Sequence, residues 1–131
     1  MIYCCCFSQG HTQTELQFIN DYPIKLDGGC SFYTFDSTSI DLNRFIFIVS
    51  AKKVGFISVN NHYIYLKSTK NVKVADKKFI TYFSGEGYDI ILNVTKVNKI
   101  DDNNSLYAGF MDIKYKNSIQ KFKIHGKVGE F

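Results

Sequence analysis

The residues that could carry acid–base, nucleophilic or metal chemistry are few and scattered in this chain of 131 residues. None of the histidines, His11, His62 and His125, has a second histidine or cysteine two or four residues further on, where one strand or helix turn would present two metal ligands. The chain has no G-x-S-x-G elbow, no phosphate-binding glycine loop and no dinucleotide fingerprint. The pattern therefore predicts no catalytic residue, no metal site and no cofactor, and we expect a protein that is not an enzyme.

Carboxylates are also scarce inside the expected strands, where Asp89 and Asp112 are the main examples. General acid–base catalysis needs such a group beside a second titratable side chain. A cleft that held His125, Asp112 and another polar group would favour an enzyme.

The four cysteines do not have the spacing of a metal site. Cys4, Cys5 and Cys6 are consecutive, whereas a zinc site usually needs two Cys-x2-Cys pairs. Cys30 stands alone in the rest of the chain, so we expect it to be a small buried apolar residue.

The first nine residues, MIYCCCFSQ, are apolar and uncharged, and a polar stretch follows. This pattern is typical of the end of a secretory signal peptide, with Cys6 and Ser8 at the small-x-small cleavage positions and Gln9 as the first mature residue. We therefore expect residues 1–8 to be a signal-peptide remnant, residues 9–131 to be a single β domain, and the protein to be periplasmic or extracellular. The alternative is a cytoplasmic protein with an apolar N-terminal strand.

The charge balance argues against a nucleic-acid partner. The chain has 16 basic and 12 acidic residues, and every basic residue except Arg44 is a lysine. Nucleic-acid recognition usually relies on arginine, whose planar group pairs with phosphate and guanine. We expect a solvated lysine-rich surface, and no apolar run approaches the roughly 18 residues of a transmembrane segment.

The elements that must position any site are β-strands. From Arg44 to Val128 apolar and polar residues alternate between short turn signals, and 12 Phe and 9 Tyr suit half-buried strands. The fold is therefore predicted to be all-β, an antiparallel meander of about eight strands forming a barrel or barrel-like sandwich, with at most one short N-terminal helix within residues 11–20. The expected strands are 31–35, 44–50, 54–59, 62–67, a weak edge strand around Val72 and Val74, 78–84, 88–100, 106–116 and 119–128.

Two hairpins define expected strand registers. Asn60-Asn61 is a two-residue turn that sets Ile57 opposite Ile64 and Phe56 opposite Tyr65. In the last hairpin a turn at Asn117-Ser118 would set Ile113 opposite Phe122, Met111 opposite Ile124 and Asp112 opposite Lys123.

An aromatic patch is the one binding feature that the sequence predicts. If Ile57 and Ile64 point inward, then Phe56, Tyr63 and Tyr65 point outward, and exposed aromatic clusters mark interfaces. The alternative is that the N-terminal segment or a second sheet covers this face.

Four stretches, GGCSFYTF, VGFISVNNHYIYLK, ITYFSGEGYDIIL and KFKIHGKVGEF, resemble those of a group of uncharacterised small exported bacterial β-rich proteins. That group carries an N-terminal GCSCYFS-like motif and a C-terminal GECGC-like motif. Here Cys30 is kept, Phe32 stands at the second cysteine position and the C-terminal cysteines are missing. The resemblance implies export and a β fold, and it brings no activity.

We therefore expect a non-enzymatic exported domain that binds a protein or envelope component, an organisation that would suit an inhibitor or immunity protein. The alternative is a β-barrel that holds a small apolar ligand. An internal cavity of several hundred Å³ would favour the ligand, and a filled interior with an aromatic surface patch would favour the protein partner.

Overall fold

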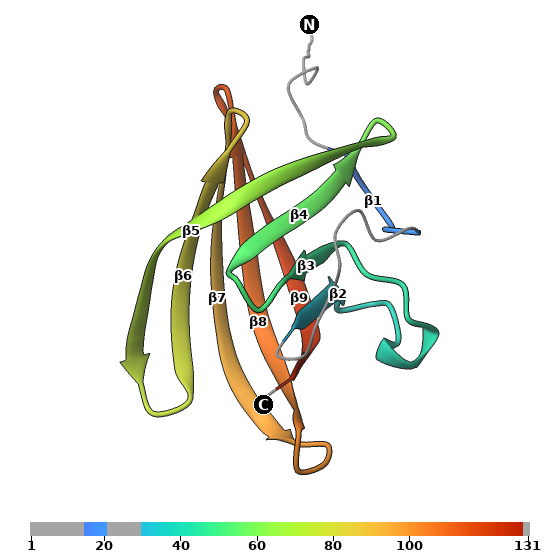
Figure 1. The fold of residues 1–131 in the computed structure, drawn as a ribbon, viewed down its shortest axis with the longest axis vertical. Helices are drawn as coiled ribbons and strands as arrows, with labels where there is room; N and C mark the ends of the chain where they lie inside the picture. The colour runs from blue at the N-terminus through green and yellow to red at the C-terminus, as the bar shows by residue number, and fades with distance from the viewer. Residues whose placement is uncertain (1–14, 21–29, 130–131) are drawn as a thin grey trace, which may run out of the picture.

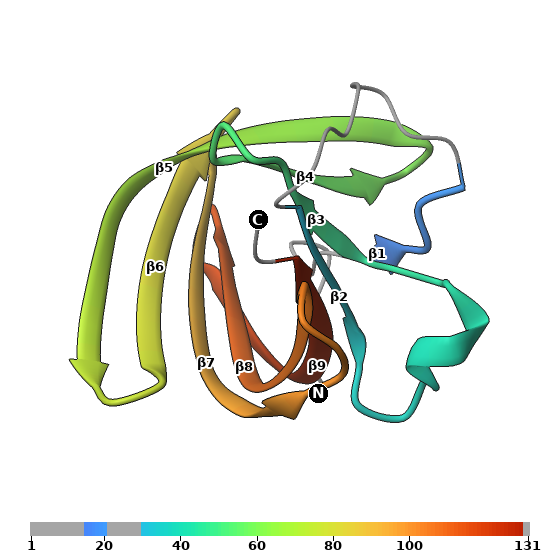
Figure 2. The same ribbon diagram turned by 60° about the horizontal axis from the view of Figure 1, so that its bottom comes forward.

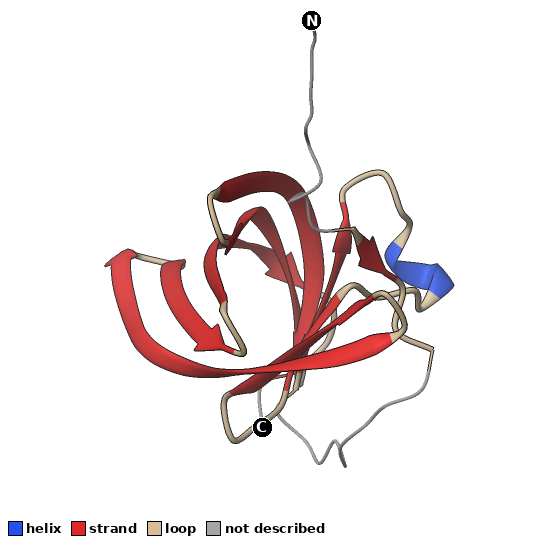
Figure 3. Cartoon of the chain, turned by 90° about the horizontal axis from the view of Figure 1, so that it is seen from above, coloured by secondary structure: helices blue, strands red, loops and turns tan. Residues whose placement is uncertain are grey.

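The computed structural model describes residues 15–20 and 30–129, which form nine β-strands and one 3-10 turn. The strands are β1 (Leu16–Gln17), β2 (Ser31–Phe35), β3 (Phe47–Val49), β4 (Val54–Val59), β5 (His62–Ala75), β6 (Lys78–Gly85), β7 (Tyr88–Lys99), β8 (Asn104–Tyr115) and β9 (Ser118–Gly129). The 3-10 turn, η2 (Ile40–Leu42), lies outside the strands between β2 and β3 (Figure 3). Within the described ranges, no helix has the length and hydropathy that crossing a membrane requires.

Strands β2 to β9 form a closed antiparallel barrel (Figure 1). Each strand pairs with the next along the chain, and β9 returns to pair with β2, so that Tyr33 lies opposite Gly126. Strand β1 lies outside this ring and pairs with the end of β4. The predicted all-β meander is confirmed, and it closes as a barrel.

Two-residue periodicity determines which side chains fill the barrel. Tyr88, Ile90, Leu92 and Val94 alternate along β7 and are all buried, as the sequence predicts. Their partners across the ladder on β8, such as Ile113 opposite Ile90, are equally buried. The opposite face of the same strands is more polar and is exposed to water at positions such as Asp89, Thr95 and Lys114.

A second, smaller apolar cluster lies on the outer side of the wall. Ile19 packs with Phe45, Ile48 and Phe56, and its backbone N–H donates to the Phe45 carbonyl at 2.8 Å. Strand β3 is therefore buried on both faces, which explains why residues 44–50 are apolar at successive positions.

The register of the last hairpin differs from the prediction by two residues. The turn lies at Lys116 and Asn117, so Met111 pairs with Phe122 and Asp112 with Lys121. Within this turn Lys116 has a positive φ of 56°. A two-residue slip leaves every side chain on its face, so the hydrophobic pattern could not distinguish the two registers.

Strand β5 is longer than predicted, and the N-terminal segment is not helical where it is described. β5 continues without interruption from His62 to Ala75, with register shifts at Ser68/Lys70 and Lys73/Ala75, in place of a separate weak strand. In the region expected to form a short helix, Leu16–Gln17 is a strand, because pairing with β4 satisfies its backbone groups. Residues 11–14, and the proposed signal-peptide remnant 1–8, lie outside the described residues.

Candidate functional site

Side chains fill the barrel interior. Phe47, Ile57, Ile90 and Met111 are each 0% exposed, and the ring of Phe47 packs edge-on against Phe83 with centroids 5.1 Å apart. Such interdigitated packing leaves little free volume.

A small pocket of about 120 Å³ opens where β2 and β3 face β5 and β6. Its floor is apolar and includes Phe83, and its rim is polar and includes Lys53, Ser68 and Asn71. The hydroxyl of Thr81, which also lines the pocket, donates to the side-chain oxygen of Asn71 at 3.0 Å. Small-molecule sites usually measure about 300–1,000 Å³, so this space suits a single side chain better than a ligand.

Tyr33 forms part of this pocket and is a neutral phenol. Burial raises the pKa of Tyr33 well above its ordinary value, although a hydrogen bond with the Ser31 side chain opposes the shift, and the nearby Tyr107 adds to it. Ionisation is therefore disfavoured in the folded barrel, and Tyr33 provides hydrogen bonding here without charge.

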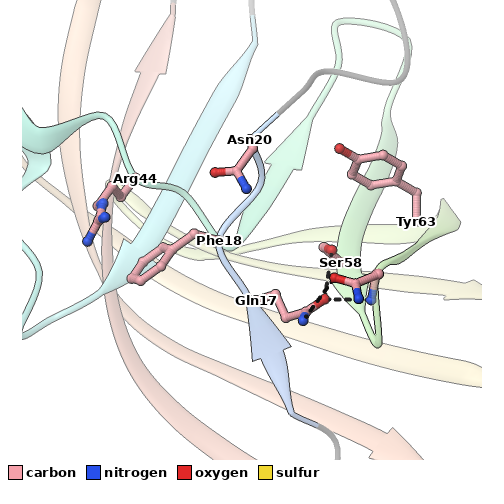
Figure 4. Close-up of a pocket in the computed structure, with 7 residues that line it drawn as sticks. Gln17, Phe18, Asn20, Arg44, Ser58 and Tyr63 are labelled. Carbon is pink, nitrogen blue, oxygen red and sulfur yellow. Dashed lines mark hydrogen bonds between the residues drawn. The ribbon is translucent and has the colours of Figure 1, made fainter.

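A larger hollow lies on the outer wall, where residues 15–20 cross β4 and the β4–β5 turn (Figure 4). Its volume is about 540 Å³. The residues that line it are Gln17, Phe18, Asn20, Arg44, Ser58, Asn61 and Tyr63.

Gln17 connects residues 15–20 to the barrel by hydrogen bonds beside this hollow, which we call the outer pocket. Its Oε1 accepts hydrogen bonds from the Asn61 backbone N–H at 2.7 Å and from the Ser58 hydroxyl at 3.3 Å. Its Nε2 donates to the Asn61 side-chain oxygen at 3.4 Å. These contacts join residues more than 40 positions apart and set the shape of the pocket.

Among the described residues that line it, the outer pocket carries one permanent positive charge and no carboxylate. The Arg44 guanidinium lies 5.3 Å from the centre of the Phe18 ring, a cation–π contact that holds the side chain beside the opening (Figure 4). Arginine in this position can pair with a carboxylate or a carbonyl group of a partner. Sequence reasoning missed Gln17, Phe18 and Arg44 as site residues, and the one signal for them is that Arg44 is the single arginine of the chain.

The predicted aromatic patch forms one cluster, but not all of it is accessible. Phe56 contacts both Tyr63 and Tyr65, with ring centroids 6.2 Å and 6.3 Å apart, yet Phe56 itself is 0% exposed beneath Ile19. The covering that was the alternative interpretation is therefore present over Phe56. Tyr63 is partly buried at the outer pocket, and Tyr65 is 39% exposed.

Among the described residues, His125 and Asp112 contact different partners. The β8–β9 register sets Ala108 opposite His125, four positions from Asp112. His125 Nε2 donates to the Thr38 carbonyl at 2.5 Å, and Asp112 lies 3.9 Å from the Lys121 amine. Among residues 15–20 and 30–129 there is no group of three His, Cys, Asp or Glu side chains placed to hold a metal.

The remaining residues that the sequence analysis considered are Cys30, His62 and His11. Cys30 is buried, as expected of a small apolar residue, and His62 is exposed at the start of β5. His11 lies outside the described residues. No protein-family model, curated protein or solved structure matches this chain.

Proposed function

We propose that this barrel is a non-enzymatic domain that binds a protein or envelope component through its outer wall, at Tyr65, Tyr63 and the adjoining outer pocket. The observation that carries the proposal is the contrast between a filled interior and an outer wall with a 540 Å³ hollow. Tyrosine and arginine are the residue types enriched at binding hot spots, and Arg44, Tyr63 and Tyr65 gather on this wall.

The alternative, a barrel that holds a small apolar ligand, has weaker support. Its interior would need an apolar cavity of several hundred Å³. The described lumen instead holds closely packed rings and the 120 Å³ pocket with its polar rim. Ligand entry would require displacement of buried side chains such as Phe47.

We also propose that the domain works outside the cytoplasm, where an inhibitor or immunity protein would meet its target. The support is the pattern of residues 1–8, which lie outside the described residues. N-terminal sequencing of the protein from its native host tests this step. A chain that begins at Gln9 would support export, and an intact Met1 would overturn it.

Site-specific photo-crosslinking tests the binding role. A benzoyl-phenylalanine replaces Tyr65 in one variant and, as a matched control, Ile119 in another, because Ile119 is 68% exposed on a different strand. Irradiation in the native host is expected to give one cross-linked protein of discrete mass from position 65 and none from position 119.

The recovered partner then allows affinity measurements. Arg44→Ala and Tyr65→Ala are each expected to weaken binding by about tenfold or more, the loss typical of a hot-spot residue. Arg44→Lys keeps the charge but loses the planar group, and it should fall between the wild type and Arg44→Ala. Equal cross-linking at both positions, or a stoichiometric small molecule that native mass spectrometry finds in the folded barrel, would contradict the proposal.

A further inference from the structure

Strand β5 changes partner along its length. It pairs with β4 from His62 to Lys67 and with β6 from Lys67 to Ala75. The last backbone contact on the β4 side is the Ser68 N–H donating to the Lys53 carbonyl at 3.1 Å. Beyond this point β5 is the outermost strand of the hairpin in Figure 2, and no described strand pairs with its other edge.

The alternation of an antiparallel ladder identifies the backbone groups on that edge. Successive residues of a strand direct their N–H and C=O groups to opposite sides. Val72 pairs with Ile80 of β6 between the register shifts at Ser68/Lys70 and Lys73/Ala75, and we infer from the alternation that the backbone groups of its neighbours Asn71 and Lys73 point away from β6. Both residues are exposed. The edge therefore presents a short row of donors and acceptors to solvent.

Side-chain contacts hold this edge in an extended conformation before any partner arrives. The Thr69 hydroxyl donates to the Tyr82 carbonyl at 3.3 Å, and the Thr81 hydroxyl donates to the Asn71 side-chain oxygen at 3.0 Å. A preorganised edge lowers the entropic cost of adding another strand.

The charge around the edge is strongly positive. Residues 67–78 read KSTKNVKVADKK, with five lysines and a single acidic residue, Asp76. Lys53 adds a further positive charge from the β3–β4 turn, on the other side of the 120 Å³ pocket. An acidic partner is therefore favoured, and a second copy of this chain would bring like charges together.

The 120 Å³ pocket lies beside this edge, because Ser68 and Asn71 of β5 contribute to its rim. Side chains of an added strand would alternate between the pocket side and solvent. The polar rim of Lys53, Ser68 and Asn71 suits a short acidic or hydroxylated side chain.

We propose that the β5 edge from Lys70 to Lys73 binds an extended acidic segment of a partner protein as an added strand, with one of its side chains in the 120 Å³ pocket. Strand addition obtains affinity from backbone hydrogen bonds and specificity from alternate side-chain positions. The inference rests on the proposed function in requiring a protein ligand, but it uses a surface separate from Tyr65 and the outer pocket. A single-stranded nucleic acid would use the lysines and leave the strand edge unpaired.

The probe for this proposal is a ten-residue peptide that alternates glutamate with threonine and valine, and its control carries lysine in place of glutamate. Fluorescence anisotropy with the full chain is expected to show binding of the acidic peptide only. Hydrogen exchange of the Asn71 and Lys73 amides is expected to slow by about tenfold or more on binding, because both N–H groups become paired.

Variants separate the edge from general electrostatics. Asn71→Pro removes one outward N–H and is expected to weaken peptide binding by about tenfold, with the urea midpoint serving as the check on folding. Lys73→Glu should weaken binding, and Lys116→Glu should not, because Lys116 lies in the β8–β9 turn at the other end of the barrel (Figure 1).

Three outcomes would overturn the edge proposal: no slowing of exchange at Asn71 and Lys73, tighter binding of a single-stranded oligonucleotide that displaces the peptide, or self-association of Lys73→Glu without loss of peptide affinity. The last result would show that the lysines only guard an open edge against aggregation. A partner cross-linked at Tyr65 that binds the Asn71→Pro variant normally would leave the proposed function intact while this inference failed. Peptide binding at the edge without any cross-link at Tyr65 would support this inference and contradict the proposed binding role of Tyr65.

Discussion

Truncation of Phe47 measures how completely the barrel interior is filled. The ring is 0% exposed, stacks on Tyr33 with centroids 6.2 Å apart and meets Phe83 edge-on at 5.1 Å. It also occupies the space over Gly55, where an added Cβ would lie 2.7 Å from a ring carbon of Phe47. Phe→Ala changes at packed sites lower the free energy of unfolding by about 3–5 kcal/mol. Because two aromatic contacts are lost as well, we expect Phe47→Ala to lower it by about 4 kcal/mol.

Equilibrium unfolding in urea, followed by far-UV circular dichroism, gives this number directly. With a slope of about 2 kcal/mol per molar urea, typical of a domain of this size, the midpoint should fall by about 2 M with the slope unchanged. Phe110→Ala is the matched control, because Phe110 is 43% exposed on the outer face of β8 and contacts the Lys121 amine at 5.5 Å. Phe110→Ala should lower the free energy of unfolding by less than about 1 kcal/mol.

If Phe47→Ala and Phe110→Ala lowered the free energy of unfolding equally, the reasoning would be refuted. That result would mean that Phe47 gains nothing from its surroundings, and that the lumen is loose enough to admit a ligand.

Three further substitutions test the backbone geometry and the buried phenol. Gly109→Ala should cost about 1–3 kcal/mol, because a Cβ there would collide with the Asn93 carbonyl oxygen of the neighbouring strand, and a wild-type urea midpoint would contradict this close approach. Lys116→Gly should stabilise the barrel by up to about 1 kcal/mol, since Lys116 holds a φ of 56°, and a lower melting temperature would show that this turn differs in solution. Burial raises the pKa of Tyr33 above its unfolded value near 10, so stability should be fully present below about pH 10 and fall above it by up to about 1.4 kcal/mol per pH unit. Tyr33→Phe should lessen that alkaline loss in unfolding curves measured from pH 8 to 12, and an identical pH dependence in both proteins would exclude Tyr33 as its source.

Local patterns were sufficient for most of the strands and for one turn. The alternation of Tyr88, Ile90, Leu92 and Val94 predicts an inward face, and all four are buried. Two asparagines in succession predict a tight turn, and Asn60 and Asn61 both have positive φ, with Ile57 opposite Ile64 as expected. These features depend on residues close together in the chain, so neighbouring side chains are enough to specify them.

The candidate sites were less predictable because they join distant segments. Phe56 has the position of an outward aromatic residue, but Ile19 covers it. Arg44, Gln17 and Tyr63 form the outer pocket only after the N-terminal segment pairs with β4. No local sequence pattern predicts such a contact between separate parts of the chain.

By itself, the sequence determined an all-β chain with strands of known inward and outward faces, because side-chain alternation and turn chemistry act over a few residues. Only the tertiary structure decided how the sheet closes, that the last hairpin turns at Lys116, and that β5 runs past β4, so that no described strand pairs with the edge at Asn71 and Lys73. The physical reason is that register and closure depend on which distant strands meet. A shift by two residues, or a change of partner along one strand, leaves the hydrophobic pattern unaltered.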